Sequence, residues 1–182
     1  WNRIHADPGP LGYFDFRVGD VHCLTLDGRR YCDPVTTPNT PAKTKLGRRQ
    51  FDWMRHILTT SDAAMFVVFS GDIFATRADP RNHRRVDDCF IYGWPDEYRR
   101  VMTRFMDVQL GGRRVVVLSG DAHGLRMHYH PDPRGRPRAA SLSVTEFICS
   151  GLRPGLWTAS NPDDPTLDPR RHVLGRPGGG ML

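Results

Sequence analysis

The sequence predicts an α/β protein in which strands of mixed direction and helices pack in layers. Three observations support this fold class. Two short segments of alternating polarity flank a turn, two continuous apolar runs have the length of strands, and amphipathic segments of helical period lie before each run. Because a hairpin and crossover units occur in one chain, a purely parallel sheet is not expected.

The first elements are a predicted β-hairpin and a loop. Residues 13–18 alternate between apolar and polar side chains, Gly19-Asp20 follow as a two-residue turn, and residues 21–26 return antiparallel. Three prolines and several threonines in residues 33–46 then disfavour regular structure.

Two amphipathic helices are predicted next. The first covers residues 48–59, where apolar side chains recur at helical spacing. The second begins near Pro95, which two acidic residues follow, and ends at Gly111-Gly112. Between the helices, residues 75–95 are charged and irregular. The apolar positions of the second helix are Tyr98, Val101, Met102 and Phe105.

Two buried strands carry the apolar runs, at residues 63–69 and 114–118. Each run stops at Ser-Gly-Asp. Two more strands are predicted at residues 125–130 and 141–149, separated by a loop rich in proline, glycine and arginine.

The length of 182 residues indicates one domain. We place it at residues 1–150. Residues 151–182 show no periodicity and many prolines and glycines, which predicts an irregular tail. No apolar stretch is long enough for a membrane span, and no signal peptide opens the chain, so the compartment stays open.

The composition excludes some functions and leaves others open. The net charge is +6, yet Lys43 and Lys45 are the only lysines among 26 basic residues. This bias reflects either the base composition of the coding DNA or selection for bidentate phosphate contacts by arginine. Nucleic-acid binding is not favoured, because the aromatic residues fall mostly at predicted core positions. The four cysteines form no C-x-x-C pair, which argues against a zinc ribbon.

Candidate chemistry lies where the two buried strands end. Asp72 and Asp121 follow them, and ligands of open α/β sheets collect at the carboxyl ends of strands. His123 adds an imidazole two residues after Asp121, so this loop can offer an oxygen and a nitrogen to a metal. For Asp72, a plain turn is the favoured interpretation.

Other polar residues have simpler interpretations. Gly19-Asp20-Val21-His22 has the same Gly-Asp-x-His pattern as residues 120–123, but its place in the hairpin indicates a turn.

His128 and His130 share a strand face, which we interpret as solvated, although such a pair could bind a metal. Asp27 could face the site and Arg29 could bind a phosphate, and a turn explains Asp27 almost as well.

Several segments, taken in order, resemble the alkaline phosphatase D (PhoD-like) branch of the metallophosphatases. They are Leu26-Asp27-Gly28-Arg29, Leu46-Gly47 to Gln50 with Trp53, Gly93-Trp94 to Arg100, Val115 to His123, and Glu146-Phe147. The most specific is Val-Val-Leu-Ser-Gly-Asp-Ala-His at residues 116–123.

The resemblance implies a two-sheet sandwich flanked by helices and a metal centre that hydrolyses phosphate monoesters or diesters. Asp121 and His123 would be its late metal motif, with calcium, iron, manganese or zinc as possible ions.

The earlier metal motifs of that family do not occur in this sequence, so the chain looks like the C-terminal half of such a domain. The N-terminal half would then be needed as a partner, because a two-metal centre takes ligands from both halves. The alternative is a catalytically incomplete fragment that acts as a binding or assembly module.

Overall fold

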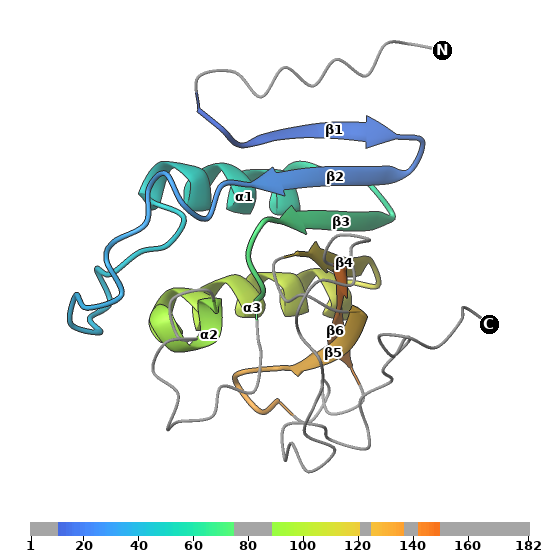
Figure 1. Cartoon of the computed structure of the whole chain (residues 1–182). Helices are drawn as coiled ribbons and strands as arrows, with labels where there is room; N and C mark the ends of the chain where they lie inside the picture. Colours follow the sequence, from blue (N-terminus) through green and yellow to red (C-terminus); the bar gives the residue numbers. More distant parts are fainter. Residues whose placement is uncertain (1–10, 75–88, 121–124, 137–141, 150–182) are drawn as a thin grey trace, which may run out of the picture.

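The structure is a computed structural model that describes residues 11–74, 89–120, 125–136 and 142–149. Its centre is a six-stranded mixed sheet with the order β1-β2-β3-β4-β6-β5 (Figure 1). The four inner strands are parallel, and the two edge strands run antiparallel to their neighbours. The strands are β1 (Phe14–Val18), β2 (Val21–Leu26), β3 (Met65–Ser70), β4 (Arg114–Ser119), β5 (Leu125–Pro131) and β6 (Ser143–Cys149).

Three helices connect the strands: α1 (Arg48–Thr60), α2 (Phe90–Gly93) and α3 (Pro95–Leu110). The long helices α1 and α3 pack on the same face of the sheet (Figure 1). The core lies between them and the sheet, since alternate strand residues point toward the helices. Its fully buried members include Leu24, Phe66, Val68, Met54, Val117 and Phe105.

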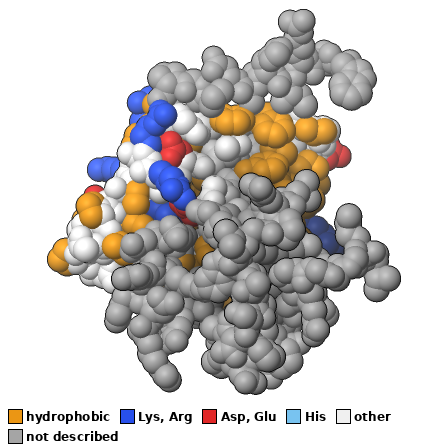
Figure 2. All heavy atoms as spheres, viewed as in Figure 1, with side chains coloured by type: hydrophobic (Ala, Val, Ile, Leu, Met, Phe, Trp, Pro, Cys, Tyr) orange, Lys and Arg blue, Asp and Glu red, His pale blue; other side chains and the backbone are white. Residues whose placement is uncertain are grey.

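The opposite face of the sheet is also apolar, and neither α1 nor α3 covers it. The rings of Phe14 and Phe16 stack at 6.3 Å between centroids, and Phe16 stacks on Phe69 at 6.4 Å. Val67 and Leu118 are only half-buried there. Figure 2 shows apolar side chains gathered over this part of the molecule. We call this surface the open sheet face.

The α/β class and the mixed sheet are confirmed, and so are the hairpin, both amphipathic helices and the four further strands. The short helix α2 lies in a segment predicted to be irregular. The described residues form a single sheet, so they do not show the two-sheet sandwich. The predicted tail, 151–182, lies outside the described residues. Within the described ranges, no helix has the length and apolar character that crossing a membrane requires.

Candidate active site at the carboxyl edge of the sheet

The carboxyl ends of the parallel strands meet at one edge of the sheet. Leu26 of β2 is paired with Ser70 of β3, which is paired with Ser119 of β4. Each strand is followed closely by an aspartate: Asp27, Asp72 and Asp121. The register therefore confirms that the two Ser-Gly-Asp segments start side by side.

The predicted metal motif follows this edge directly. Asp121 and His123 lie outside the described residues, so their metal role stays a prediction. Gly120, the residue before Asp121, is described. A Cβ atom on Gly120 would lie 3.5 Å from the backbone oxygen of Gly71, so the two glycine backbones are in close contact.

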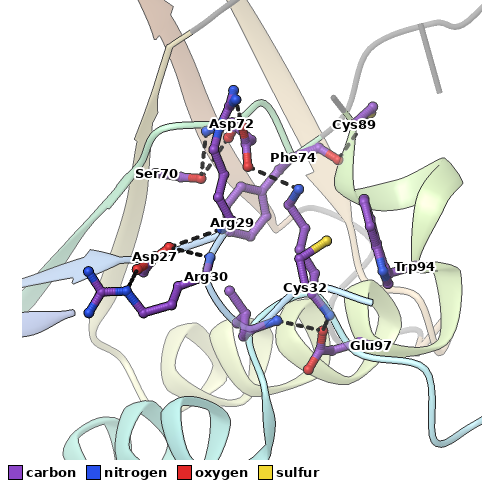
Figure 3. Close-up of polar contacts among 12 residues, drawn as sticks. Asp27, Arg29, Arg30, Cys32, Ser70, Asp72, Phe74, Cys89, Trp94 and Glu97 are labelled. Carbon is purple, nitrogen blue, oxygen red and sulfur yellow. Dashed lines mark hydrogen bonds and ion pairs between the residues drawn. The ribbon is translucent and has the colours of Figure 1, made fainter. Parts of the chain in front are cut away.

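Asp72 lies between two cations (Figure 3). Its Oδ1 accepts a hydrogen bond from Arg29 Nη2 at 3.0 Å, and its Oδ2 is 3.0 Å from Lys45 Nζ. The Asp72 and Lys45 side chains are only 3% and 4% exposed, whereas the Arg29 side chain is 69% exposed. Burial of a carboxylate is favourable only when such partners compensate its lost hydration. The metal role predicted for Asp72 stays a prediction.

A cavity of about 430 Å³ opens beside this cluster. Its lining includes Gly28, Arg29, Cys32, Lys45, Asp72 and Trp94. Lys45 Nζ lies 4.2 Å from the centre of the Trp94 ring, so the indole face stabilises the ammonium group. Burial raises the pKa of the Cys32 thiol, and the charge of Lys45 only partly opposes this. Cys32 is therefore a neutral thiol in the cavity at neutral pH.

Two buried side chains hold the segment between β2 and α1, which lines part of the cavity. Glu97, in the first turn of α3, accepts hydrogen bonds from the backbone N–H groups of Lys45 and Leu46. Gln50 of α1 binds both the N–H and the carbonyl of Asp27, at 2.8 and 2.9 Å. The two helices thus fix the two ends of one segment, which joins β2 to α1, and these contacts set where Arg29 and Lys45 lie.

A second polar network joins the strand ends from the core side. Glu146 of β6 accepts hydrogen bonds from the Ser119 hydroxyl and, at 2.7 Å, from the Phe74 N–H. Its other oxygen is 2.9 Å from His130 Nε2, and His130 Nδ1 is 2.8 Å from the Tyr98 hydroxyl. Burial acts to raise the pKa of Glu146, but the contacts with His130 and Ser119 outweigh it, and the net pKa is lowered. Burial also raises the pKa of Tyr98.

The histidine pair on β5 corrects one prediction. His128 and His130 are 8% and 2% exposed, so their strand face is buried and not solvated. The reason is that this face of the sheet packs toward α3, where the Tyr98 hydroxyl contacts His130, and Glu146 of the neighbouring strand β6 contacts His130 as well.

The turn interpretations of two aspartates are confirmed. Asp27 Oδ1 accepts the backbone N–H groups of Arg29 and Arg30, which makes a turn. Asp20 lies in the hairpin turn, where its carbonyl accepts a hydrogen bond from the backbone N–H of Ala64.

No role in the site was predicted for Lys45, Glu97 or Glu146, although Glu146 lies in a segment that carries the family resemblance. Glu146 had a usable signal, because it alternates with Val144 and Ile148 on a strand face whose other members are apolar. Lys45 had a weaker one, as one of only two lysines in the chain. Within the part of the chain that the structure describes, no three His, Cys, Asp or Glu side chains gather into a metal-binding group.

Fold and site together define an α/β protein with a charged cavity at the carboxyl edge of its parallel strands, the usual place for a ligand or active site in this class. The chain belongs to the PhoD-like phosphatase family, whose family model matches residues 3–172. This confirms the family resemblance found in the sequence.

A solved structure described as "Structure of PhoD" is similar to this chain, with a TM-score of 0.54 and 21% sequence identity. The match covers 76% of this chain and 28% of the PhoD chain. At this identity the likeness shows the fold, and this chain spans little more than a quarter of the length of that protein. None of the curated proteins matches the chain.

Proposed function

We propose that the protein carrying this chain is a metal-dependent phosphoesterase that hydrolyses phosphate monoesters or diesters. The family supports a phosphoesterase, and the observation that carries the proposal is the edge where β2, β3 and β4 end together. There Arg29 and Lys45 lie at a cavity, and Gly120 leads into the predicted motif. Family membership favours this function over a non-catalytic assembly module.

The chain would contribute ligands and cations to the reaction. Asp121 and His123 offer a carboxylate, which suits calcium or manganese, and an imidazole, which suits iron or zinc. A bound ion would lower the pKa of a water and neutralise phosphoryl oxygens. Arg29, with several N–H donors in a planar group, would bind the oxygens of the phosphate ester.

The family's second sheet, where it is present, would cover the open sheet face. Phe16, Val67 and Leu118 leave an apolar surface there that water does not stabilise. An N-terminal half of the domain is the partner we propose, and it would also supply the remaining metal ligands. The matched fraction of PhoD, 28% of its chain, is consistent with such a missing part.

The direct test is hydrolysis of an aryl phosphate monoester and diester by the protein with its N-terminal half. We expect Asp121→Ala and His123→Ala each to lower kcat at least about 100-fold, since each removes a metal ligand. Asp20→Ala is the matched control, because Asp20 has the same Gly-Asp-x-His context but lies in the hairpin turn. Unchanged turnover and metal content in both variants would exclude the proposed site.

A further inference from the structure

We propose that the cavity beside Asp72 is an oxyanion subsite in which Lys45 and Arg29 bind a phosphate group. The proposal rests on the phosphoesterase function for its ligand class, and it adds a specific cation, Lys45. Lys45 lies outside the segments that carry the family resemblance, whereas Gly28, Arg29 and Trp94 of the cavity lie within them.

The geometry of Lys45 supports this role. An ammonium group has three N–H donors, and among the described residues one carboxylate oxygen, Oδ2 of Asp72, accepts from Nζ. The indole ring of Trp94 covers another side of the group. Among the described residues, N–H groups of Lys45 therefore remain that can donate to a ligand in the cavity. The rest of the Lys45 side chain is buried away from water.

Asp72 organises the two cations. Because its two oxygens face one cation each, it holds Arg29 and Lys45 on either side of one carboxylate. The charge of Lys45 is thus compensated in the empty cavity, and the exposed guanidinium of Arg29 adds a second positive charge. Asp33 also lines the cavity, but its Oδ2 accepts the backbone N–H of Thr44 at 2.8 Å.

Gly28 makes room for this arrangement. A Cβ atom there would lie 2.6 Å from Asp72 Oδ2 and 3.2 Å from Lys45 Cε, so only glycine allows the close approach. Gly120, which precedes the predicted metal motif in the sequence, is in close contact with Gly71, the residue before Asp72.

Lys43 provides a matched control. It is buried like Lys45 and its Nζ lies 5.6 Å from the centre of the same Trp94 ring. Its ammonium, however, donates to the Val35 carbonyl at 2.7 Å and to Asn39 Oδ1 at 3.2 Å, away from Asp72. The two lysines thus share burial and an aromatic neighbour but differ in access to the cavity.

The first experiment is a calorimetric titration of the chain with inorganic phosphate. We expect stoichiometric binding that weakens about tenfold or more in Lys45→Met and in Arg29→Gln, and changes less than about twofold in Lys43→Met. Arg29→Gln guards against a folding defect, because Arg29 is exposed. No phosphate binding, or equal binding by all variants, would overturn the proposal.

A second experiment needs no substitution. Reductive methylation of the wild-type chain, followed by mass spectrometry, reports separately on its two lysines. Phosphate should slow modification of Lys45 relative to Lys43, and equal rates with and without phosphate would contradict the subsite. Hydrolysis without Lys45-dependent binding would overturn the subsite alone, whereas Lys45-dependent binding without hydrolysis would overturn only the phosphoesterase function.

Discussion

At the scale of single residues, Gly28 is a position where the site has no room for a side chain. In Gly28→Ala the new methyl group would collide with an Asp72 carboxylate that Lys45 and Arg29 hold in place. We expect a loss of about 1–3 kcal/mol in the free energy of unfolding, measured by urea denaturation. Gly71→Ala is the control, because no described residue other than its two chain neighbours has an atom within 4 Å of its Cβ position. Equal losses in the two variants would contradict this geometry.

Some residues of the site could be placed from the sequence pattern and others could not. Asp72 and Asp121 could be placed at the edge of the sheet, because each follows an apolar run of strand length. The pairing of Asp72 with Lys45 and Arg29 could not be predicted, since Asp72 follows β3, the two cations lie in the segment between β2 and α1, and none of the three has a periodic signal. The polarity of His128 and His130 suggested a solvated face, because a single sequence does not show that Tyr98 and Glu146 would satisfy His130.

At the scale of elements, Glu146 ties β6 to the ends of β3 and β4. It faces His130 of β5, Ser119 of β4 and the Phe74 N–H, and Tyr98 of α3 binds His130 in turn. Its pKa in the folded chain is lowered from the ordinary value of 4.5. As the pH falls below 4.5, Glu146 takes up a proton in the unfolded chain before it does so in the folded chain. The stability that ionised Glu146 contributes is therefore lost as the pH falls through its lowered pKa in the folded chain.

Glu146→Gln should weaken this acid sensitivity. The glutamine keeps the shape of the side chain, and its carbonyl oxygen can still accept hydrogen bonds from the Phe74 N–H and the Ser119 hydroxyl. We expect the urea midpoint of the wild type to fall more steeply than that of the variant as the pH drops from about 6 to about 3. Parallel curves for the two proteins would argue against an ionised Glu146 in the folded chain.

The long elements were predictable for simple reasons. Helices α1 and α3 each bury a stripe of apolar side chains, and this stripe appears as a period in the sequence. Helix α2 has four residues, too few to show a period, so its segment was predicted to be irregular. Tertiary contacts position it, since Phe90 is buried against Phe74 with ring centroids 5.2 Å apart.

At the scale of the whole molecule, the two faces of the sheet should respond differently to polar substitution. Val68 is fully buried under the helices, whereas Val67, its neighbour on β3, lies on the half-exposed open sheet face. Val68→Thr buries a hydroxyl group and should cost about 1–3 kcal/mol of unfolding free energy. Val67→Thr should cost under about 1 kcal/mol. Comparable losses in urea denaturation would mean that both faces are equally buried.

The apolar character of both faces was visible in the sequence, because the runs of β3 and β4 do not alternate. That pattern predicts a strand covered on both sides. Only one cover, the helix layer, is present among the described residues, and this is why the two-sheet sandwich predicted for the chain does not appear in them. The sequence of a single strand does not specify which part of a protein packs on the open sheet face.

A chelator titration is the sharpest test of whether hydrolysis by this protein requires a bound metal ion. The protein carrying this chain and its N-terminal half would be assayed on an aryl phosphate ester before and after treatment with EDTA, and again after calcium, iron, manganese or zinc is restored. We expect hydrolysis to be lost with the chelator and recovered with at least one of these ions. Hydrolysis at an unchanged rate in excess chelator, by protein shown to contain no bound metal, would contradict it.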